Sequence, residues 1–307
     1  MKPGLRVLKA AIPPGIAASA ALAAVALAAV SADAQQPGIL DRTALTYRQA
    51  SFVWMDRLHP LALRTFVPLA GIEFAISGLL WILNDKETLE SIGGQFIRKF
   101  TFVSFWFAIL FSWELWIPYL AEGFRYAGVA ASGRTTLDPS EIVRIGIDLQ
   151  MAIASAAFDL LSFNPFSEFS IQIAALLVLV AYVMAAVAVT YTLIQMYLIT
   201  GAGVLFLGFA AWQGTAQWTD NYLNLLAYVG IKMMVLFLLV GLGTTIGADL
   251  VETTNGMRWA DMAPAGEIFF VALLFTSLVL GLPVMIARHI TQGQSFGLVN
   301  AIRAKDH

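Results

Sequence analysis

The sequence predicts an all-α membrane protein: a polytopic helix bundle with about five transmembrane helices, a re-entrant or half-hairpin segment and extracytoplasmic amphipathic helices. Hydrophobic residues make up 59% of the 307 positions, charged residues only 12%, and the mean hydropathy is +0.76. A soluble globular domain carries about 25% charged residues. Apolar runs of about 20 residues, the length that crosses a bilayer, recur along the chain.

The composition also restricts the classes of function. The formal net charge of −2 argues against a broad nucleic-acid-binding surface, which would be basic. No cysteine is present, so disulfides, zinc-thiolate sites and thiol nucleophiles are excluded. The histidines His59, His289 and His307 lie far apart, and no phosphate-binding loop, dinucleotide fingerprint or nucleophile elbow occurs. We therefore predict a protein that is not an enzyme, with no catalytic residue, no cofactor and no metal.

Residues 1–34 are typical of a secretory signal peptide. A basic start is followed by a small-residue apolar run over residues 16–30 and by the cleavage pattern Ala32-Asp33-Ala34. Cleavage between Ala34 and Gln35 would leave the mature N-terminus in the periplasm. The alternative is an uncleaved first transmembrane helix.

Residues 35–62 are expected to form a periplasmic N-terminal segment. An amphipathic helix is predicted over about residues 43–58, ending before Pro60 because the residue before a proline disfavours helical geometry. The helix would either lie on the membrane interface or dock a partner.

Residues 63–120 contain the first two predicted spans, over about 63–83 and 100–120, joined by a short charged loop. Glu73 lies well inside the first span, so we expect it to face the bundle interior or another subunit. Glu114 lies between Trp113 and Trp116 near the end of the second span, which is typical of an interfacial aromatic belt.

Residues 121–170 form the predicted periplasmic central loop. Asp138, Pro139 and Glu141 suit the N-cap, N1 and N3 positions of a helix, and apolar residues then recur at helical spacing. An amphipathic helix is therefore predicted here.

Residues 171–287 contain three more predicted spans, over about 171–200, 222–246 and 267–287. Residues 201–220 are predicted to be re-entrant, because they begin apolar and glycine-rich and end polar and aromatic. A full helical hairpin with six spans is the alternative. Five spans place the basic tail, residues 288–307, in the cytoplasm, as the positive-inside tendency favours. This topology predicts a multi-pass membrane protein with a cytoplasmic C-terminus.

Lys232 and a set of small and aromatic residues are the remaining site candidates. A lysine in an apolar helix costs about 3 kcal/mol at the centre of a span, so Lys232 either snorkels, pairs within its subunit or serves as an inter-subunit or pore charge, with Glu73 as one candidate partner. The residues expected at helix-packing or subunit interfaces are Gly201, Gly203, Gly208, Trp212, Trp218, Gly230, Gly241, Gly243 and Gly247.

Several short segments together resemble the TrbL family, the polytopic inner-membrane subunit of conjugative type IV secretion systems. They are LAGIE at 69–73, WIP at 116–118, LDPSEI at 137–142, GAGVLFLGF at 201–209, YVGIK at 228–232 and LVGLG at 239–243. One connection departs from the family pattern. Residues 210–217 are longer than the family's Gly-Gly-Ser-Arg-like connection and lack its arginine, so no role tied to that arginine is carried over.

The resemblance implies a channel or assembly-platform subunit that acts as a homo-oligomer. It further implies contact with a stalk or minor-pilin subunit, with periplasm-spanning scaffold subunits, with separate secretion ATPases and with membrane lipid, and transient contact with transferred DNA. The alternative function is a small-solute permease or ion channel that uses Glu73 and Lys232 as intramembrane charges. Such transporters usually carry internal repeats, which are absent from this sequence.

The signal peptide generates the first testable prediction. The protein purified from membranes should begin at Gln35, because the cleavage pattern ends at Ala34. Mass spectrometry of the N-terminal peptide measures this directly, and recovery of Met1 in the assembled protein would contradict it.

Overall fold

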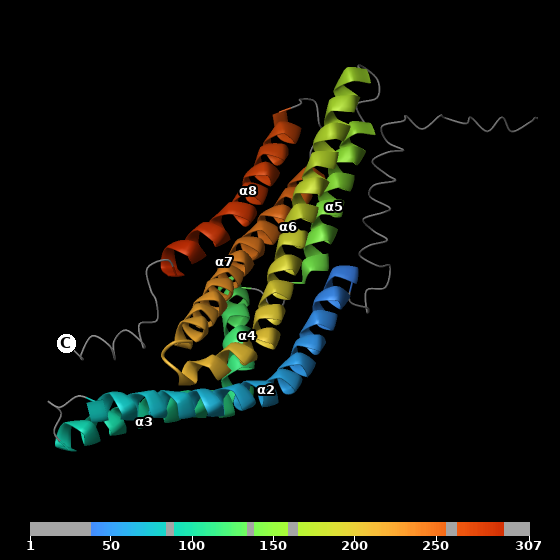
Figure 1. Cartoon of the computed structure of the whole chain (residues 1–307). Helices are drawn as coiled ribbons and strands as arrows, with labels where there is room; N and C mark the ends of the chain where they lie inside the picture. The colour runs from blue at the N-terminus through green and yellow to red at the C-terminus, as the bar shows by residue number, and fades with distance from the viewer. Residues whose placement is uncertain (1–37, 84–88, 134–137, 159–164, 256–262, 292–307) are drawn as a thin grey trace, which may run out of the picture. The chain divides into compact units, whose positions relative to one another are not determined.

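The computed structural model describes residues 38–83, 89–133, 138–158, 165–255 and 263–291, and each regular element in these ranges is helical (Figure 1). The predicted signal peptide and most of the predicted C-terminal tail lie outside the described residues. The elements are α2 (Ile39–Leu83), α3 (Leu89–Phe111), α4 (Trp113–Ala131), α5 (Pro139–Phe158), α6 (Pro165–Leu207), the 3₁₀ helix η1 (Gly208–Ala211), α7 (Ala216–Asn255) and α8 (Ala263–Thr291).

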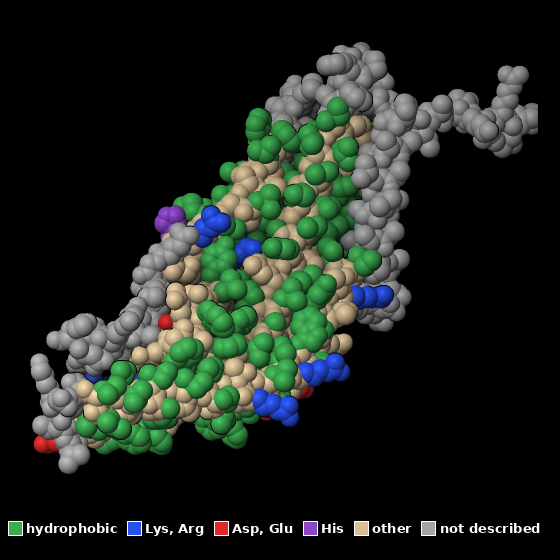
Figure 2. All heavy atoms as spheres, in the orientation of Figure 1, with side chains coloured by type: hydrophobic (Ala, Val, Ile, Leu, Met, Phe, Trp, Pro, Cys, Tyr) green, Lys and Arg blue, Asp and Glu red, His purple; other side chains and the backbone are tan. Residues whose placement is uncertain are grey.

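The all-α membrane fold predicted from the sequence is confirmed. Among the described residues, α2, α6, α7 and α8 are each long and apolar enough to cross a membrane, and the bent pair α3–α4 makes a fifth candidate. Hydrophobic side chains cover much of the visible surface, with basic side chains at only a few places (Figure 2). Such a surface is suited to lipid or to other subunits rather than to water.

Helix α2 does not end before Pro60, so that prediction is wrong. The helix continues through Pro60 and Pro68 to Leu83 and bends along its length (Figure 1). A proline inside a helix removes one backbone hydrogen bond and kinks the helix. The predicted interfacial helix and first span are therefore one helix.

The predicted second span is broken at Ser112, where α3 and α4 meet at an angle of 71°. The Ser112 hydroxyl donates to the Ala108 carbonyl at 2.7 Å, a bond that bends helices. The Trp116 indole donates to the Ile109 carbonyl at 2.9 Å. The Trp116 side chain thus forms a hydrogen bond with a backbone carbonyl beside the bend. Residues next to the bend therefore stabilise it.

The chain divides into two compact units. The first contains the described residues within Met1–Asp41, Asp138–Val187 and Leu242–Leu278. Helix α5 begins at Pro139 as predicted, and Ile142, Leu149 and Ile153 are almost completely buried. Tyr182 lies at the centre of this unit: its ring lies 5.3 Å from that of Phe275, and its hydroxyl donates to the Gly243 carbonyl at 3.4 Å.

The second unit contains the described residues within Arg42–Leu137, Ala188–Gly241 and Val279–His307. Here the structure differs from the predicted re-entrant segment at residues 201–220. Residues 201–207 complete α6, η1 and a short turn follow, and α7 already begins at Ala216. Gly201 and Gly203 lie within α6 and Gly208 begins η1, and another chain segment approaches each of them closely. The segment is therefore a tight connection between two long helices.

Helix α4 packs closely against α7 through Gly128. A Cβ atom at this position would lie 2.8 Å from the Met234 carbonyl oxygen and 2.8 Å from the Phe237 Cβ. Real Cβ atoms do not approach backbone this closely, so only glycine fits. Gly123, on the same helix, is exposed and has nothing within 4 Å of its Cβ position.

These two glycines provide a matched test of the packing. Gly128→Ala should destabilise the protein by about 1–3 kcal/mol through overpacking against α7. Gly123→Ala should be neutral or stabilising by up to about 1 kcal/mol, because alanine is the better helix former. Unfolding of the purified variants in detergent measures both, and equal effects would mean that α4 and α7 do not pack in this way.

Candidate functional site

A buried ion pair joins α2 and α3 to the α6–α7 connection, all within the second unit. Only 4% of Glu73 is exposed. Its Oε1 lies 2.7 Å from the Lys99 Nζ, and its Oε2 accepts the backbone N–H of Gln213 at 3.2 Å. Lys99 also donates to the Ser77 hydroxyl, which lies one helical turn beyond Glu73. Each carboxylate oxygen thus has one partner, and we call Glu73, Ser77, Lys99 and Gln213 the Glu73 cluster.

The connection that the Glu73 cluster holds is also stabilised internally. The Thr215 hydroxyl donates to the Phe209 carbonyl at 2.8 Å, and the Thr219 hydroxyl donates to the Phe206 carbonyl at 2.7 Å. The Phe209 and Trp218 rings meet edge to face at 4.9 Å. These contacts join the two ends of the connection. The backbone N–H of Gln213 therefore reaches Glu73 from an ordered segment.

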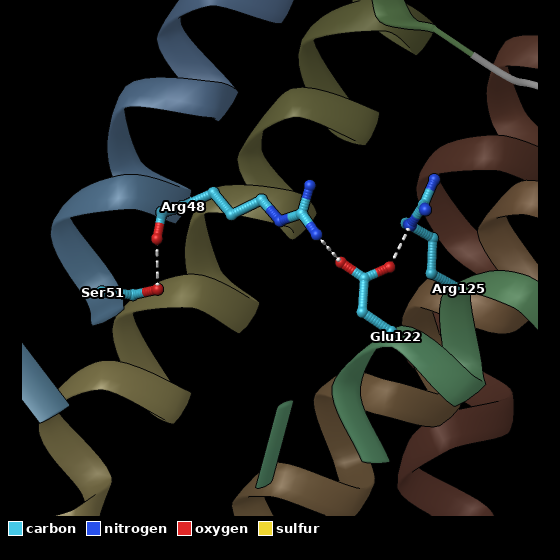
Figure 3. A network of polar contacts seen from close by, with 4 residues as sticks. All are labelled: Arg48, Ser51, Glu122 and Arg125. Carbon is cyan, nitrogen blue, oxygen red and sulfur yellow. Dashed lines mark hydrogen bonds and ion pairs between the residues drawn. The ribbon is translucent and has the colours of Figure 1, made fainter. Parts of the chain in front are cut away.

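A second polar cluster lies between α2 and α4 (Figure 3). Arg48 Nη2 lies 2.8 Å from Glu122 Oε1, and Arg125 Nε lies 2.7 Å from Glu122 Oε2. The Ser51 hydroxyl donates to the Arg48 carbonyl at 2.7 Å. We call Arg48, Ser51, Glu122 and Arg125 the Glu122 cluster. Its side chains are between 34% and 42% exposed where the ion pairs form.

Lys232 has polar neighbours within its own chain but no acidic partner among the described residues. Its Nζ donates to the Gln195 Oε1 at 3.2 Å and lies 5.2 Å from the centre of the Tyr191 ring. The Glu73 carboxylate is paired with Lys99 instead. The structure therefore does not bring Glu73 and Lys232 together within one chain.

The glycines that the sequence suggested for helix packing all lie against residues of the same chain. Gly201 meets Ser51 and Trp54, Gly203 meets Tyr222, Gly208 meets Ala62, Gly230 meets Phe124, Gly241 meets Ser132, Gly243 meets Phe275, and Gly247 meets Tyr182 and Ile145. Trp218 is 52% exposed, Trp212 is partly exposed and Glu114 is exposed. We infer internal packing for the glycines, and Trp218 stays a candidate for contact outside the chain.

Sequence reasoning missed the partners that complete both clusters. The charged loop predicted between the first two spans includes Lys99, whereas this residue lies on α3. Gln213 contributes through its backbone, which no residue pattern reveals. The sequence does indicate the pairing of Glu122 with Arg125, because opposite charges three residues apart meet on one helical face.

The two clusters generate a prediction about stability. Glu73→Gln should destabilise the protein by about 3 kcal/mol, because it leaves Lys99 largely buried without a counter-charge. Glu122→Gln makes the same chemical change at a partly exposed site and should cost no more than about 1 kcal/mol. Chemical or thermal unfolding of the purified variants checks the difference. Equal losses of stability would show that the contributions of the two clusters do not depend on how deeply they are buried.

Comparison with known proteins places these features in a family. The model of the TrbL/VirB6 plasmid conjugal transfer proteins matches residues 70–282. The chain is 24% identical over 238 residues to the probable conjugal transfer protein TrbL of Sinorhizobium fredii (strain NBRC 101917 / NGR234), a match that covers 74% of this chain and 59% of the relative. It is also 24% identical over 268 residues to the conjugal transfer protein TrbL of Rhizobium radiobacter, covering 84% of this chain and 66% of the relative.

The alignments thus span about three fifths to two thirds of the length of these relatives. The family match includes the C-terminal part of α2 from Ala70 onward, all of α3 to α7 and most of α8, and with them Glu73, Glu122 and Lys232. Because the family model matches well over half of the sequence, the chain belongs to the TrbL/VirB6 family of plasmid conjugal transfer proteins.

Proposed function

We propose that the chain is a non-catalytic channel or assembly-platform subunit of a conjugative type IV secretion apparatus in the bacterial inner membrane, and that it acts as a homo-oligomer. Family membership and the candidate spans support the membrane role. The proposed partners are further copies of the chain, a stalk or minor-pilin subunit, periplasm-spanning scaffold subunits, secretion ATPases and membrane lipid. Contact with transferred DNA would be transient. The proposed orientation has a periplasmic N-terminus and a cytoplasmic C-terminus.

The observation that carries the oligomeric proposal is a stripe of polar residues on the apolar α6–α7 pair. Lys232 contacts Tyr191 and Gln195 of α6. Tyr228 and Asn221 precede Lys232 at helical spacing on the same face of α7. We call these five residues the polar stripe. None of the five is buried, and Tyr191 is 62% exposed.

A polar stripe is poorly suited to contact with acyl chains. An ammonium group that faces lipid near the centre of a span costs about 3 kcal/mol, and Lys232 lies within the candidate span Ala216–Gly247. The cost disappears if this face meets a water-filled lumen or a second copy of the chain. The contacts around Glu73 give no comparable support for a solute permease, because its carboxylate is already bonded to Lys99 and to the Gln213 backbone.

Two equally exposed leucines test this proposal. Leu225 lies on the face of the polar stripe and Leu280 lies on α8, and each is 44% exposed. Because the native chain has no cysteine, Leu225→Cys should be modified by a water-soluble thiol reagent or form disulfide-linked dimers in membranes, whereas Leu280→Cys should do neither. Equal reactivity of the two variants would contradict a special role for this face.

The secretion role is tested by conjugative transfer. Deletion of the gene should abolish transfer, and the wild-type gene should restore it. Lys232→Met should lower the transfer frequency by roughly tenfold or more, because it removes the charge on which the polar stripe depends, while the amount of protein in the membrane stays the same. Normal transfer in the deletion strain would overturn the proposed function, and normal transfer with Lys232→Met would assign the lysine to snorkelling.

A further inference from the structure

Helix α3 lies across α4 and α7 within the second unit, whereas α4 lies alongside α7. Three contacts follow one another in the same order along α4 and α7: Phe124 with Gly230, Gly128 with Met234, and Ser132 with Gly241. Helix α4 therefore runs beside α7 and in the same direction. Helix α3, in contrast, meets α4 at an angle of 71°.

The second half of α2 accompanies α3 in this crosswise direction. The Phe66 ring lies 5.8 Å from the Phe107 ring, and the Phe74 ring lies 5.8 Å from the Phe96 ring. Because residue numbers rise on one helix as they fall on the other, the two segments are antiparallel. Figure 1 shows this pair running across the ends of α4 and α7 that lie near the α6–α7 connection.

The direction of α3 limits how far it can extend through a membrane that α7 crosses. Helix α3 has 23 residues and is therefore about 34 Å long. At 71° to α4, it rises only about 11 Å along the direction of α4 and α7. A tilt of α7 by about 20°, which is usual for a span, raises this to about 22 Å at most. Both values are smaller than the hydrocarbon thickness of about 30 Å.

One side of α3 is an exposed row of aromatic side chains. Four phenylalanines are spaced so that they share this side, and each is between 42% and 68% exposed: Phe96, Phe100, Phe107 and Phe111. We call these four residues the aromatic stripe. Phe96 stacks on Phe100 with 6.3 Å between ring centres, and Phe107 stacks on Phe111 with 6.1 Å. The stripe is therefore a continuous apolar surface.

Another side of α3, about 120° around the helix axis from the aromatic stripe, exposes Glu90, Arg98 and Thr101. Ile97 and Phe105 are exposed there as well, so this side is mixed rather than fully polar. A mixed side is typical of helices at the level of lipid headgroups, where charged groups meet water and apolar groups meet the first part of the acyl chains.

The second half of α2 is more apolar than α3. Among its exposed side chains between Pro60 and Leu83, only Arg64 is charged. Its contacts with Phe96 and Phe107 place it next to the aromatic stripe. The pair therefore has one side suited to acyl chains, formed by α2 and the stripe, and one side suited to headgroups.

We propose that α3 does not cross the membrane but lies in the plane of one leaflet, with the aromatic stripe among the acyl chains and Glu90, Arg98 and Thr101 among the headgroups. The leaflet is the one that contains the α6–α7 connection, because the Gln213 N–H of this connection is bonded to Glu73 of α2. The proposal requires only that α7 crosses the membrane and does not rest on the secretion role.

Depth measurements along α3 provide the main test. The chain has no cysteine, so full-length variants with one nitroxide-labelled cysteine can be placed in phosphatidylethanolamine–phosphatidylglycerol vesicles. Oxygen and a water-soluble nickel complex then report the depth of each label. Phe100→Cys and Phe111→Cys are separated by about 16 Å along α3, yet their depths should differ by only about 5 Å because the helix lies at 71° to α4.

Helix α8 supplies the matched control for this measurement. Phe270 and Leu280 are exposed and lie near one end and near the middle of the candidate span Phe269–Thr291. The depths of labels at Phe270→Cys and Leu280→Cys should therefore differ by about 15 Å. A difference along α3 as large as the difference along α8 would mean that α3 crosses the membrane, and it would overturn the proposal.

Two further results separate the lipid surface from other surroundings. A label at Thr101→Cys should lie at headgroup depth, shallower than its neighbour at Phe100→Cys, and equal depths would contradict the assignment of the two sides. A label at Phe100→Cys should also contact nitroxide-free acyl chains and be freely reached by oxygen. If Phe100→Cys instead forms disulfide-linked dimers in membranes and is shielded from oxygen, a second copy covers the stripe and the lipid proposal is wrong.

Discussion

The second unit depends on one constraint: the Glu73 carboxylate is buried on an apolar helix and must find partners within reach. A buried ion that lacks a partner costs several kcal/mol, more than most single side-chain contacts contribute. Lys99 and the Gln213 N–H meet this requirement with one bond to each carboxylate oxygen. Since the three groups come from α2, α3 and the α6–α7 connection, satisfying one carboxylate also positions three separate segments.

The Glu122 cluster and Lys232 also place charged groups on apolar helices, and their charges are compensated in different ways. Glu122 has two basic partners and is partly exposed, so the cluster keeps one positive charge in excess. In the described part of the chain, Lys232 contacts an amide and an aromatic ring and has no acidic partner. The three sites thus range from a neutralised buried pair, through a partly exposed cluster with excess positive charge, to a lysine without a counter-charge among these residues.

The membrane fold was predictable because its signal is the length of apolar runs, which reside in the sequence itself. The helix start at Pro139 was predictable for a similar reason, since capping residues act within a few positions. The continuation of α2 through Pro60 and the helical geometry of residues 201–207 were not predictable, because both depend on contacts with distant segments. Glu73 was identified as a functional candidate from its apolar surroundings, but its partner Lys99 is set by tertiary packing, and Gln213 takes part through its backbone.

The length of α6 has a consequence for how the protein must be produced. The apolar stretch Gln172–Ala211 has 40 residues, so it is about 60 Å long, whereas the hydrocarbon core is about 30 Å thick. Even a tilt of about 40°, the upper end of the usual range, leaves apolar turns outside the acyl region. The chain itself buries about half of the most apolar part of this stretch, and the apolar side chains that stay exposed beyond the acyl region carry a free-energy cost until other protein covers them. An orphan copy is then a natural target for membrane quality control, and a cell benefits from synthesising this chain in step with the proteins that enclose it.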